Sequence, residues 1–334
     1  MKRNILSVIR NNKILSIAMV LLFSIGLFAC NKKDIVSIDD DVEENIIVET
    51  EEEQAVDKEQ TKSDSEEGII TSDTEEDEEK IESIKSTAGY NSKYGVFLSY
   101  EGDLSRFSDY DEIVIDAQYF TKEQITEYKK GGHKVYSYLN IGSLETFRPY
   151  YNEFVDITLS DYENWEEERW IDVSNERWQN YVLYTLAPAL IEKGVDGFFV
   201  DNCDVYYMYQ NDSMLSGVAN IMKGLKGYNK AVIMNGGDTF IDAYCSKMGV
   251  WSDVITGINQ ESVFTKIDWE DENHGVSDPE DKAYFTEYLE RYSNSGADIY
   301  LLEYTKDSSV IADIDSYCKN KNFAYYVSGS IELN

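Results

Sequence analysis

Val195-Asp-Gly-Phe-Phe-Val-Asp201-Asn-Cys-Asp204 is the stretch from which the fold of this chain can be inferred. Its apolar run of two phenylalanines and a valine predicts a short buried strand, and Asp201, Asn202 and Asp204 follow within four residues. A parallel barrel presents its catalytic acids at the C-terminal ends of its strands. Asp201 is therefore our first candidate for chemistry, although Asp-Asn is equally compatible with a loop start or a helix cap.

The first 30 residues predict a secretory signal with a lipidation site. Four basic residues and no acidic ones precede an apolar run over 14–28, which leads into Leu27-Phe-Ala-Cys30. A cysteine after such a tripeptide resembles the lipobox of bacterial lipoproteins, in which that cysteine is acylated. The alternative is a plain transmembrane anchor, but the run is shorter than the roughly 20 residues that a span needs. We expect an extracytoplasmic lipoprotein, attached to the bacterial membrane only through a lipid on Cys30.

Charge divides the rest of the chain into two parts. Residues 31–90 hold 22 acidic and 6 basic residues and few aromatic ones, which predicts a disordered acidic tether. Residues 91–334 hold 42 acidic and 20 basic residues with a globular composition. This charge disfavours nucleic acid and anionic polymers and favours neutral or cationic ligands, unless it only solvates the surface. We expect a monomer.

Short apolar runs bounded by turn residues predict eight strands in the globular part. They cover residues 95–100, 112–116, 134–140, 195–201, 230–235, 253–261, 298–304 and 323–328. Helical patterns alternate with most of them, which predicts parallel pairing and, at this size, a closed (β/α)8 TIM barrel. A doubly wound open sheet is the alternative, but no glycine-rich phosphate loop supports it. Residues 141–194 contain an exceptionally long loop, and such loops are usually functional.

Polar side chains gather where the predicted strands end, which predicts a ligand-binding rim. The candidate substrate-binding residues are Tyr100, Asp116, Tyr138, Asn140, Arg148, Asp172, Asn202, Asp204, Tyr206, Asn235, Glu303 and Tyr304. The tyrosines and tryptophans after Asp201 and in the long loop could stack on a sugar ring.

Histidine and cysteine indicate no metal site. His133 precedes the third strand and His274 lies in an acidic segment, so both are interpreted as structural. Cys203, Cys245 and Cys318 have neither zinc nor disulfide-framework spacing and are expected to be buried thiols. No metal and no cofactor is implied.

Two carboxylates suffice to cleave a glycosidic bond, and Asp201 with Glu261 is the best pair because they end the fourth and sixth strands. Tips of strands two apart are roughly 10 Å apart at the backbone, and inward side chains can close this to the 5–5.5 Å of a retaining pair. Glu303 is the reserve acid, or a helper that binds sugar hydroxyls or orients Glu261.

Four motifs in order resemble glycoside hydrolase family 114 over residues 94–328. They are the opening stretch, Tyr138-Leu-Asn-Ile-Gly-Ser-Leu-Glu-Thr-Phe-Arg148-Pro, Arg169-Trp-Ile-Asp172-Val and Asn259-Gln-Glu-Ser-Val-Phe264. The resemblance implies an endo-α-1,4-polygalactosaminidase, with Asp201 as nucleophile and Glu261 as acid/base. The polysaccharide would be cationic through its free amines.

Two other functions remain open at this point. A non-catalytic carbohydrate-binding protein could use the same barrel, although such a protein has no need for both acids. A polysaccharide deacetylase is disfavoured because such enzymes rely on metal-binding histidines, which are lacking here.

Overall fold

The computed structural model describes residues 88–163, 165–268 and 273–334. The predicted signal with Cys30, and the predicted tether up to residue 87, lie outside the described residues. Tyr90, expected at the end of the tether, packs on the barrel, where its hydroxyl donates to Asp315 Oδ1 at 2.7 Å. Within the described residues, no helix is long and apolar enough to cross a membrane.

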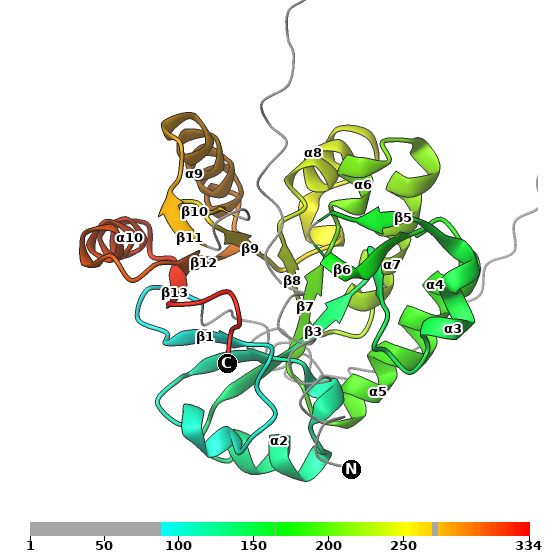
Figure 1. Ribbon diagram of the computed structural model, residues 1–334, viewed down its shortest axis with the longest axis horizontal. Helices are drawn as coiled ribbons and strands as arrows, with labels where there is room; N and C mark the ends of the chain where they lie inside the picture. Colours follow the sequence, from blue (N-terminus) through cyan, green and yellow to red (C-terminus); the bar gives the residue numbers. More distant parts are fainter. Residues whose placement is uncertain (1–87, 164, 269–272) are drawn as a thin grey trace, which may run out of the picture. The chain divides into compact units, whose positions relative to one another are not determined.

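Eight parallel strands form one sheet in the order β1-β2-β3-β7-β8-β9-β12-β13 (Figure 1). They are β1 (Tyr94–Phe97), β2 (Glu112–Ile115), β3 (Lys134–Asn140), β7 (Gly197–Asp201), β8 (Ala231–Asn235), β9 (Gly257–Glu261), β12 (Asp298–Tyr304) and β13 (Ala324–Ser328). The two end strands lie against each other, with the Phe97 and Tyr326 ring centroids 5.3 Å apart. The predicted parallel barrel is confirmed as a nearly closed one.

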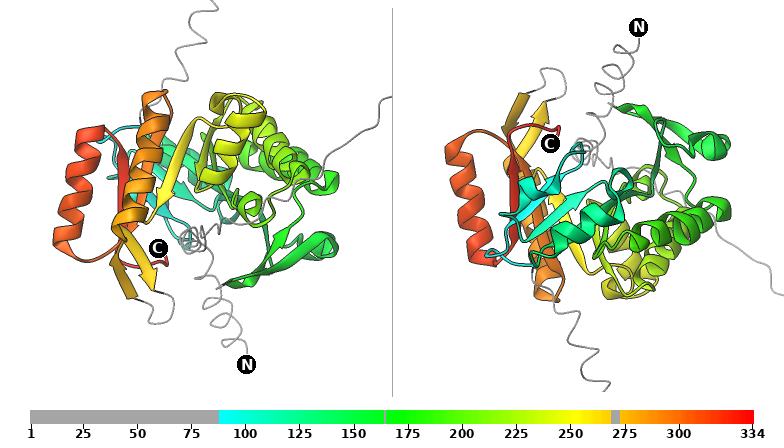
Figure 2. Two further views of the ribbon diagram at one scale, coloured as in Figure 1. Left: turned by 90° about the horizontal axis from the view of Figure 1, so that it is seen from above. Right: turned by 90° about the horizontal axis from the view of Figure 1, so that it is seen from below.

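Helices connect the strands and cover the outside of the sheet (Figure 2). The longer ones are α2 (Lys122–Lys129), α4 (Glu176–Tyr181), η5 (Val182–Leu186), α5 (Ala187–Glu192), α7 (Asp212–Lys226), α8 (Asp238–Lys247), α9 (Pro279–Asn294) and α10 (Ser308–Lys321). Short turns are η2 (Leu104–Phe107), η3 (Ala117–Tyr119), α3 (Tyr151–Phe154), η4 (Val155–Ile157), α6 (Val205–Met208) and η6 (Trp251–Asp253). Local sequence explains several ends: Thr121 and Gln124 form a capping box on α2, and Pro279 opens α9.

Two antiparallel pieces stand where the sequence predicted only loops. A three-stranded sheet in the order β4-β6-β5 consists of β4 (Ser143–Glu145), β5 (Thr158–Tyr162) and β6 (Trp165–Ile171). A hairpin pairs β10 (Thr265–Asp268) with β11 (Asn273–Val276). Strand β6 gives no period-2 signal, because its buried positions do not alternate and one of them holds an acid, Glu168.

The sixth barrel strand begins later than predicted. Residues 251–253, which the sequence pattern assigned partly to the strand, form the short helix η6, and β9 starts at Gly257. Apolar runs of this kind do not distinguish a strand from a short buried turn.

The interior of the barrel is unusually polar, although branched aliphatic side chains dominate most TIM barrels. Tyr136 and Tyr300 both donate to Glu112 Oε2, at 3.1 and 3.2 Å, and all three side chains are buried. Tyr94 packs its ring on that of Tyr300, with centroids 4.8 Å apart. This tyrosine layer lies below the ends of the strands that carry the candidate site.

Candidate active site

The structure brings Asp201 and Glu261 together through one amide. Asp201 ends β7, Asn235 ends β8 and Glu261 ends β9, so the amide stands on the strand between the two acids. Asn235 Nδ2 donates to Asp201 Oδ1 at 2.9 Å and to Glu261 Oε1 at 2.7 Å. An NH₂ group directs its two hydrogens about 120° apart, which places the two acceptor oxygens roughly 5 Å apart.

Each acid has a tyrosine of its own. The Tyr304 hydroxyl donates to Glu261 Oε2 at 2.6 Å, and the Tyr138 hydroxyl reaches Asp201 and also Glu145 Oε1, the latter at 3.4 Å. Both tyrosines are buried, and each stands on the strand next to that of its acid: Tyr304 on β12 beside β9, and Tyr138 on β3 beside β7. The predicted site residues Tyr138, Asn235 and Tyr304 therefore contact the pair directly.

Burial raises the pKa values of both acids, and it raises that of Glu261 more. It raises the pKa of Asp201 to about 6, against the hydrogen bonds from Asn235, from the Asn202 backbone and from Tyr138. It raises the pKa of Glu261 to about 8, with the charge of Asp201 adding to the effect. Two acids with pKa values on opposite sides of neutrality can act as a proton donor and an ionised partner.

Beside Tyr138 lies a buried ion cluster formed by Asp116, Glu145 and Arg148. Arg148 Nη1 is 2.7 Å from Asp116 Oδ2, and Arg148 Nε pairs with Glu145 Oε2. Burial alone would lower the pKa of the guanidinium, but the two carboxylates outweigh it and raise that pKa well above its ordinary value. Arg148 thus pairs with both acids. It links the segment after β4 to Asp116, which caps η3, and so stabilises the region next to Tyr138.

On the same side, Asn140 and Asn202 belong to a hydrogen-bond network with Ser143. Asn140 Nδ2 donates to Ser143 Oγ at 2.7 Å, Asn202 Nδ2 donates to it at 3.2 Å, and Ser143 Oγ pairs with the buried Glu168. Asn202 takes φ +64°, and a Cβ on Gly142 would meet its carbonyl oxygen at 1.8 Å. Through these contacts the small antiparallel sheet packs against Asn202, the residue that follows Asp201.

Asp204 faces the turn after β8. The backbone N–H of Gly237 donates to its two carboxylate oxygens at 3.2 and 3.3 Å. Burial, and then the charges of Asp238 and Asp201, raise the pKa of Asp204 well above its ordinary value. Tyr206 is buried nearby at 5% exposure, so its ring belongs to the core of this turn.

Three predicted rim residues do not join this group. The Tyr100 hydroxyl donates to the Asp103 carbonyl at 3.0 Å, and Asp172 accepts from Ser174 N and Oγ at 3.0 and 2.6 Å. Glu303 points away from the pair and accepts from Phe264 N, Thr265 N and Thr265 Oγ1, the last at 2.7 Å. Glu303 thus holds the segment after Glu261 in place, and substrate contacts by these three stay predictions.

The two histidines and the three cysteines were expected to be structural, and one cysteine departs from its predicted burial. His133 stacks on Tyr128 with centroids 4.5 Å apart, whereas His274 lies on β11 with its ring 6.2 Å from that of Tyr304. Cys203 and Cys318 are buried, but Cys245 is exposed, which corrects the prediction of three buried thiols. Among the described residues, no group of three or more His, Cys, Asp or Glu is arranged to hold a metal ion.

Sequence reasoning missed Tyr94, Tyr162 and Glu168. The Tyr94 hydroxyl donates to Asn259 Oδ1 at 3.2 Å, and the Tyr162 hydroxyl donates to Asn202 Oδ1 at 3.1 Å. Tyr94 begins its strand instead of ending it, so a search of strand ends passes over it. Tyr162 and Glu168 stand on strands that were not predicted at all.

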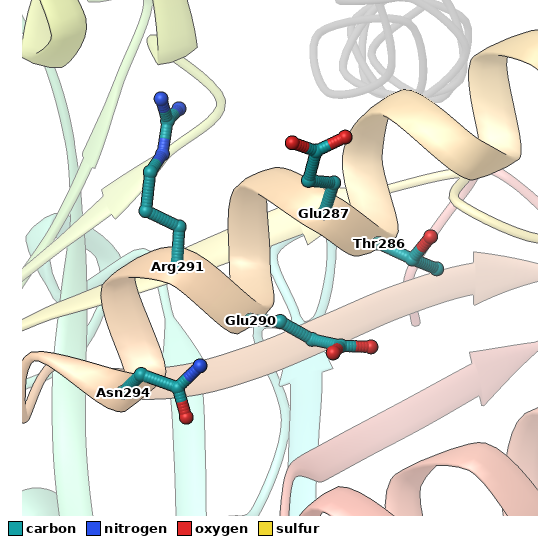
Figure 3. Close-up of a pocket in the computed structure, with 5 residues that line it drawn as sticks. All are labelled: Thr286, Glu287, Glu290, Arg291 and Asn294. Atoms are coloured by element: carbon teal, nitrogen blue, oxygen red, sulfur yellow. The ribbon is translucent and has the colours of Figure 1, made fainter.

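A hollow on the surface of α9 has no relation to this site. Thr286, Glu287, Glu290, Arg291 and Asn294 line it, and all five come from that one helix (Figure 3). Glu290 pairs with Lys321 of α10 at 2.7 Å. The hollow contains none of the predicted site residues.

A TIM barrel with two acids bridged at the C-terminal ends of its strands defines the class of the protein as a barrel glycosidase. The family profile described as "Glycoside-hydrolase family GH114" matches residues 78–329. The chain belongs to this glycoside hydrolase family, as the four sequence motifs indicated.

Solved structures with similar folds include a glycoside hydrolase domain and a protein in complex with galactosamine. The glycoside hydrolase domain of PelA from Pseudomonas aeruginosa has a TM-score of 0.60 and 14% identity over 72% of this chain and 96% of that domain. Ega3 from Aspergillus fumigatus, in complex with galactosamine, has a TM-score of 0.59 and 18% identity over 75% of this chain and 95% of its own. No significant match is found among curated proteins.

Proposed function

We propose that this protein hydrolyses internal α-1,4 bonds of a galactosamine-containing polysaccharide with retention of anomeric configuration. The bridging of Asp201 and Glu261 by one amide carries the proposal. A separation of roughly 5 Å suits direct attack by a carboxylate, whereas an inverting pair stands about 6.5–9.5 Å apart to admit a water molecule.

The two pKa values support a division of roles between the acids. Near pH 7, Asp201 with a pKa of about 6 is mostly ionised and serves as the nucleophile at the anomeric carbon. Glu261 with a pKa of about 8 is mostly protonated and donates its proton to the leaving oxygen as the glycosidic bond breaks. The resulting Glu261 carboxylate accepts from Asn235 and Tyr304, then takes a proton from the water that releases the sugar from Asp201.

The substrate class is supported by family membership and by charge. Ega3, which has the same fold, was solved with galactosamine. The globular part of this chain has 42 acidic and 20 basic residues, which would attract a partly deacetylated, cationic polymer. We expect binding of that polymer to weaken as salt rises; affinity independent of salt and of acetylation would refute the electrostatic part.

The experiment is digestion of purified α-1,4-galactosaminogalactan by the full chain, with product sizes read by mass and the newly formed anomer read by NMR. We expect oligosaccharides whose first-formed anomer is α. Asp201→Asn and Glu261→Gln should each lower the rate by about 100-fold or more while leaving polymer affinity within a few fold. Glu112→Gln, an equally buried acid elsewhere in the barrel interior, is the matched control and should stay active.

The same experiment separates this proposal from a carbohydrate-binding protein without activity. Such a protein would bind the polymer, release no product and be insensitive to the two amide substitutions. A first-formed β anomer would instead show an inverting mechanism.

We further propose that the protein acts as a monomer outside the cytoplasm, held to the membrane by a lipid on Cys30. The support for secretion and for the lipid anchor is the sequence pattern of residues 1–30. Labelled palmitate should enter the wild-type chain and not Cys30→Ala, and light scattering of the detergent-solubilised chain should give the mass of one copy. A lipid-free wild-type protein would refute the anchor.

A further inference from the structure

The amide of Asn235 can serve the catalytic pair in only one orientation. Its NH₂ group must face Asp201 and Glu261, because its carbonyl oxygen would repel an ionised Asp201. When Glu261 is protonated, an amide turned by 180° could accept that proton in a hydrogen bond. The proton would then point at Asn235 and not at the leaving oxygen of the sugar.

Two further side chains oppose this turn. Asn259 Nδ2 donates to Asn235 Oδ1 at 2.7 Å, so the carbonyl oxygen of Asn235 is already engaged on the side away from the acids. Tyr94 donates to Asn259 Oδ1 at 3.2 Å, a hydrogen bond that exists only while the NH₂ group of Asn259 faces Asn235 and that therefore adds to the preference for this orientation. A hydroxyl on β1 is thus connected to both acids through β9 and β8.

Burial raises the energetic cost of turning either amide in this chain of hydrogen bonds. Tyr94, Asn259 and Asn235 are 2%, 0% and 1% exposed. If one of these amides turned by 180°, two oxygens or two NH₂ groups would face each other between Asn235 and Asn259. Because the site is buried, water could not easily supply the lost hydrogen bonds. Each link therefore favours one orientation of the next.

We propose that Tyr94 is a positioning residue, which acts through Asn259 to hold the Asn235 amide with its NH₂ group toward Asp201 and Glu261. The inference rests on the proposed function in that these two acids are taken as the reacting pair. Tyr94 itself contacts neither acid through any hydrogen bond described above. The other titratable groups that influence the pair are Glu145 and Tyr138 at Asp201, Glu303 and Tyr304 at Glu261, and Asp204.

The test compares Tyr94→Phe with Tyr300→Phe in the full chain. Both substitutions remove one buried hydroxyl from the same layer and keep the ring, but the Tyr300 hydroxyl donates to Glu112 and not to the Asn259 relay. Complete removal of a preorganised donor costs about 100-fold or more in kcat, so loosening one should cost less, about 3- to 10-fold. We expect this loss for Tyr94→Phe, with KM within about twofold because no substrate contact is changed.

A second measurement needs no substrate. Carboxyl ¹³C NMR titration, assigned with Asp201→Asn and Glu261→Gln, gives the pKa of each acid. Because donation by Asn235 lowers both values, Tyr94→Phe should raise both, and Tyr300→Phe should change neither. If Tyr94→Phe is too unstable to measure, Asn259→Leu removes the middle link and should act in the same direction more strongly.

Unchanged pKa values and kcat in Tyr94→Phe would overturn the proposal, as would equal shifts in Tyr300→Phe. The two proposals fail separately. If wild type does not cleave galactosaminogalactan but Tyr94→Phe still raises both pKa values, the relay stands and the proposed substrate is wrong.

Discussion

Removing the Tyr304 hydroxyl tests which acid sets each side of the pH–activity profile. We expect Asp201 to set the acid limb, where activity falls at low pH, and Glu261 to set the alkaline limb, where it falls at high pH. The Tyr304 side chain is fully buried, and its hydroxyl donates to Glu261 Oε2 at 2.6 Å, while its ring packs beside that of His274. The hydrogen bond stabilises the ionised form of Glu261. Tyr304→Phe removes it and keeps the ring, so the pKa of Glu261 should rise above its present value of about 8.

The size of the shift follows from the kind of bond. A hydrogen bond to a charged group contributes about 1.5–3 kcal/mol, and one pKa unit corresponds to about 1.4 kcal/mol. The alkaline limb of kcat/KM, which reports the acid in the free enzyme, should therefore move up by about 1–2 pH units. The acid limb should stay near pH 6, because the hydrogen-bond partners described for Asp201 do not include Tyr304.

The assay is initial-rate hydrolysis of galactosaminogalactan from pH 4.5 to 10.5 at constant ionic strength. Tyr138→Phe is the matched variant, since its hydroxyl reaches Asp201, and it should raise the acid limb instead. An alkaline limb that does not move in Tyr304→Phe, or that moves down, would refute the assignment of Glu261 as the group behind it.

Three further predictions concern stability. Because the folded protein holds the Glu261 proton up to about pH 8 while the unfolded chain releases it near 4.5, this acid's stabilising contribution is complete below about pH 4.5 and is lost as pH rises to 8. Glu261→Gln should consequently gain a few kcal/mol over wild type between pH 5 and pH 8 in urea unfolding, and an equal difference at both pH values would contradict the shift. Arg148→Met leaves two buried acids without their cation and should cost about 3–5 kcal/mol, whereas Arg177→Met removes an exposed pair with Asp156 and should cost far less in the same measurement. Glu303→Ala removes the acceptor of two backbone N–H groups and should cost about 1–3 kcal/mol per group left unpaired; hydrogen exchange at Phe264 and Thr265 as slow as in wild type would argue against this role.

The barrel was predictable because each of its strands carries a local signal. Apolar runs such as 197–201 and 298–304 lie between turn residues, and parallel strands joined by helices leave few arrangements open. The choice of Asp201 and Glu261 followed from the same rule, since parallel strands bring their C-terminal ends to one face.

The small antiparallel sheet could not be predicted in this way. Its strand β6 places Glu168 at a buried position, where Ser143 accommodates the carboxylate. A buried acid is tolerable only with partners, and these partners come from another strand. The local pattern therefore indicated a polar loop.

What the sequence by itself determined is the order of the strands and the acids at their ends. What only the tertiary structure decided is how those acids are used: that Asn235 lies between them, that Asn259 and Tyr94 orient it, and that Glu303 turns away to hold a loop. The physical reason is that a side chain's strand position is a local property of the chain. Its hydrogen-bond partners and its pKa depend on groups that only folding brings within a few ångströms.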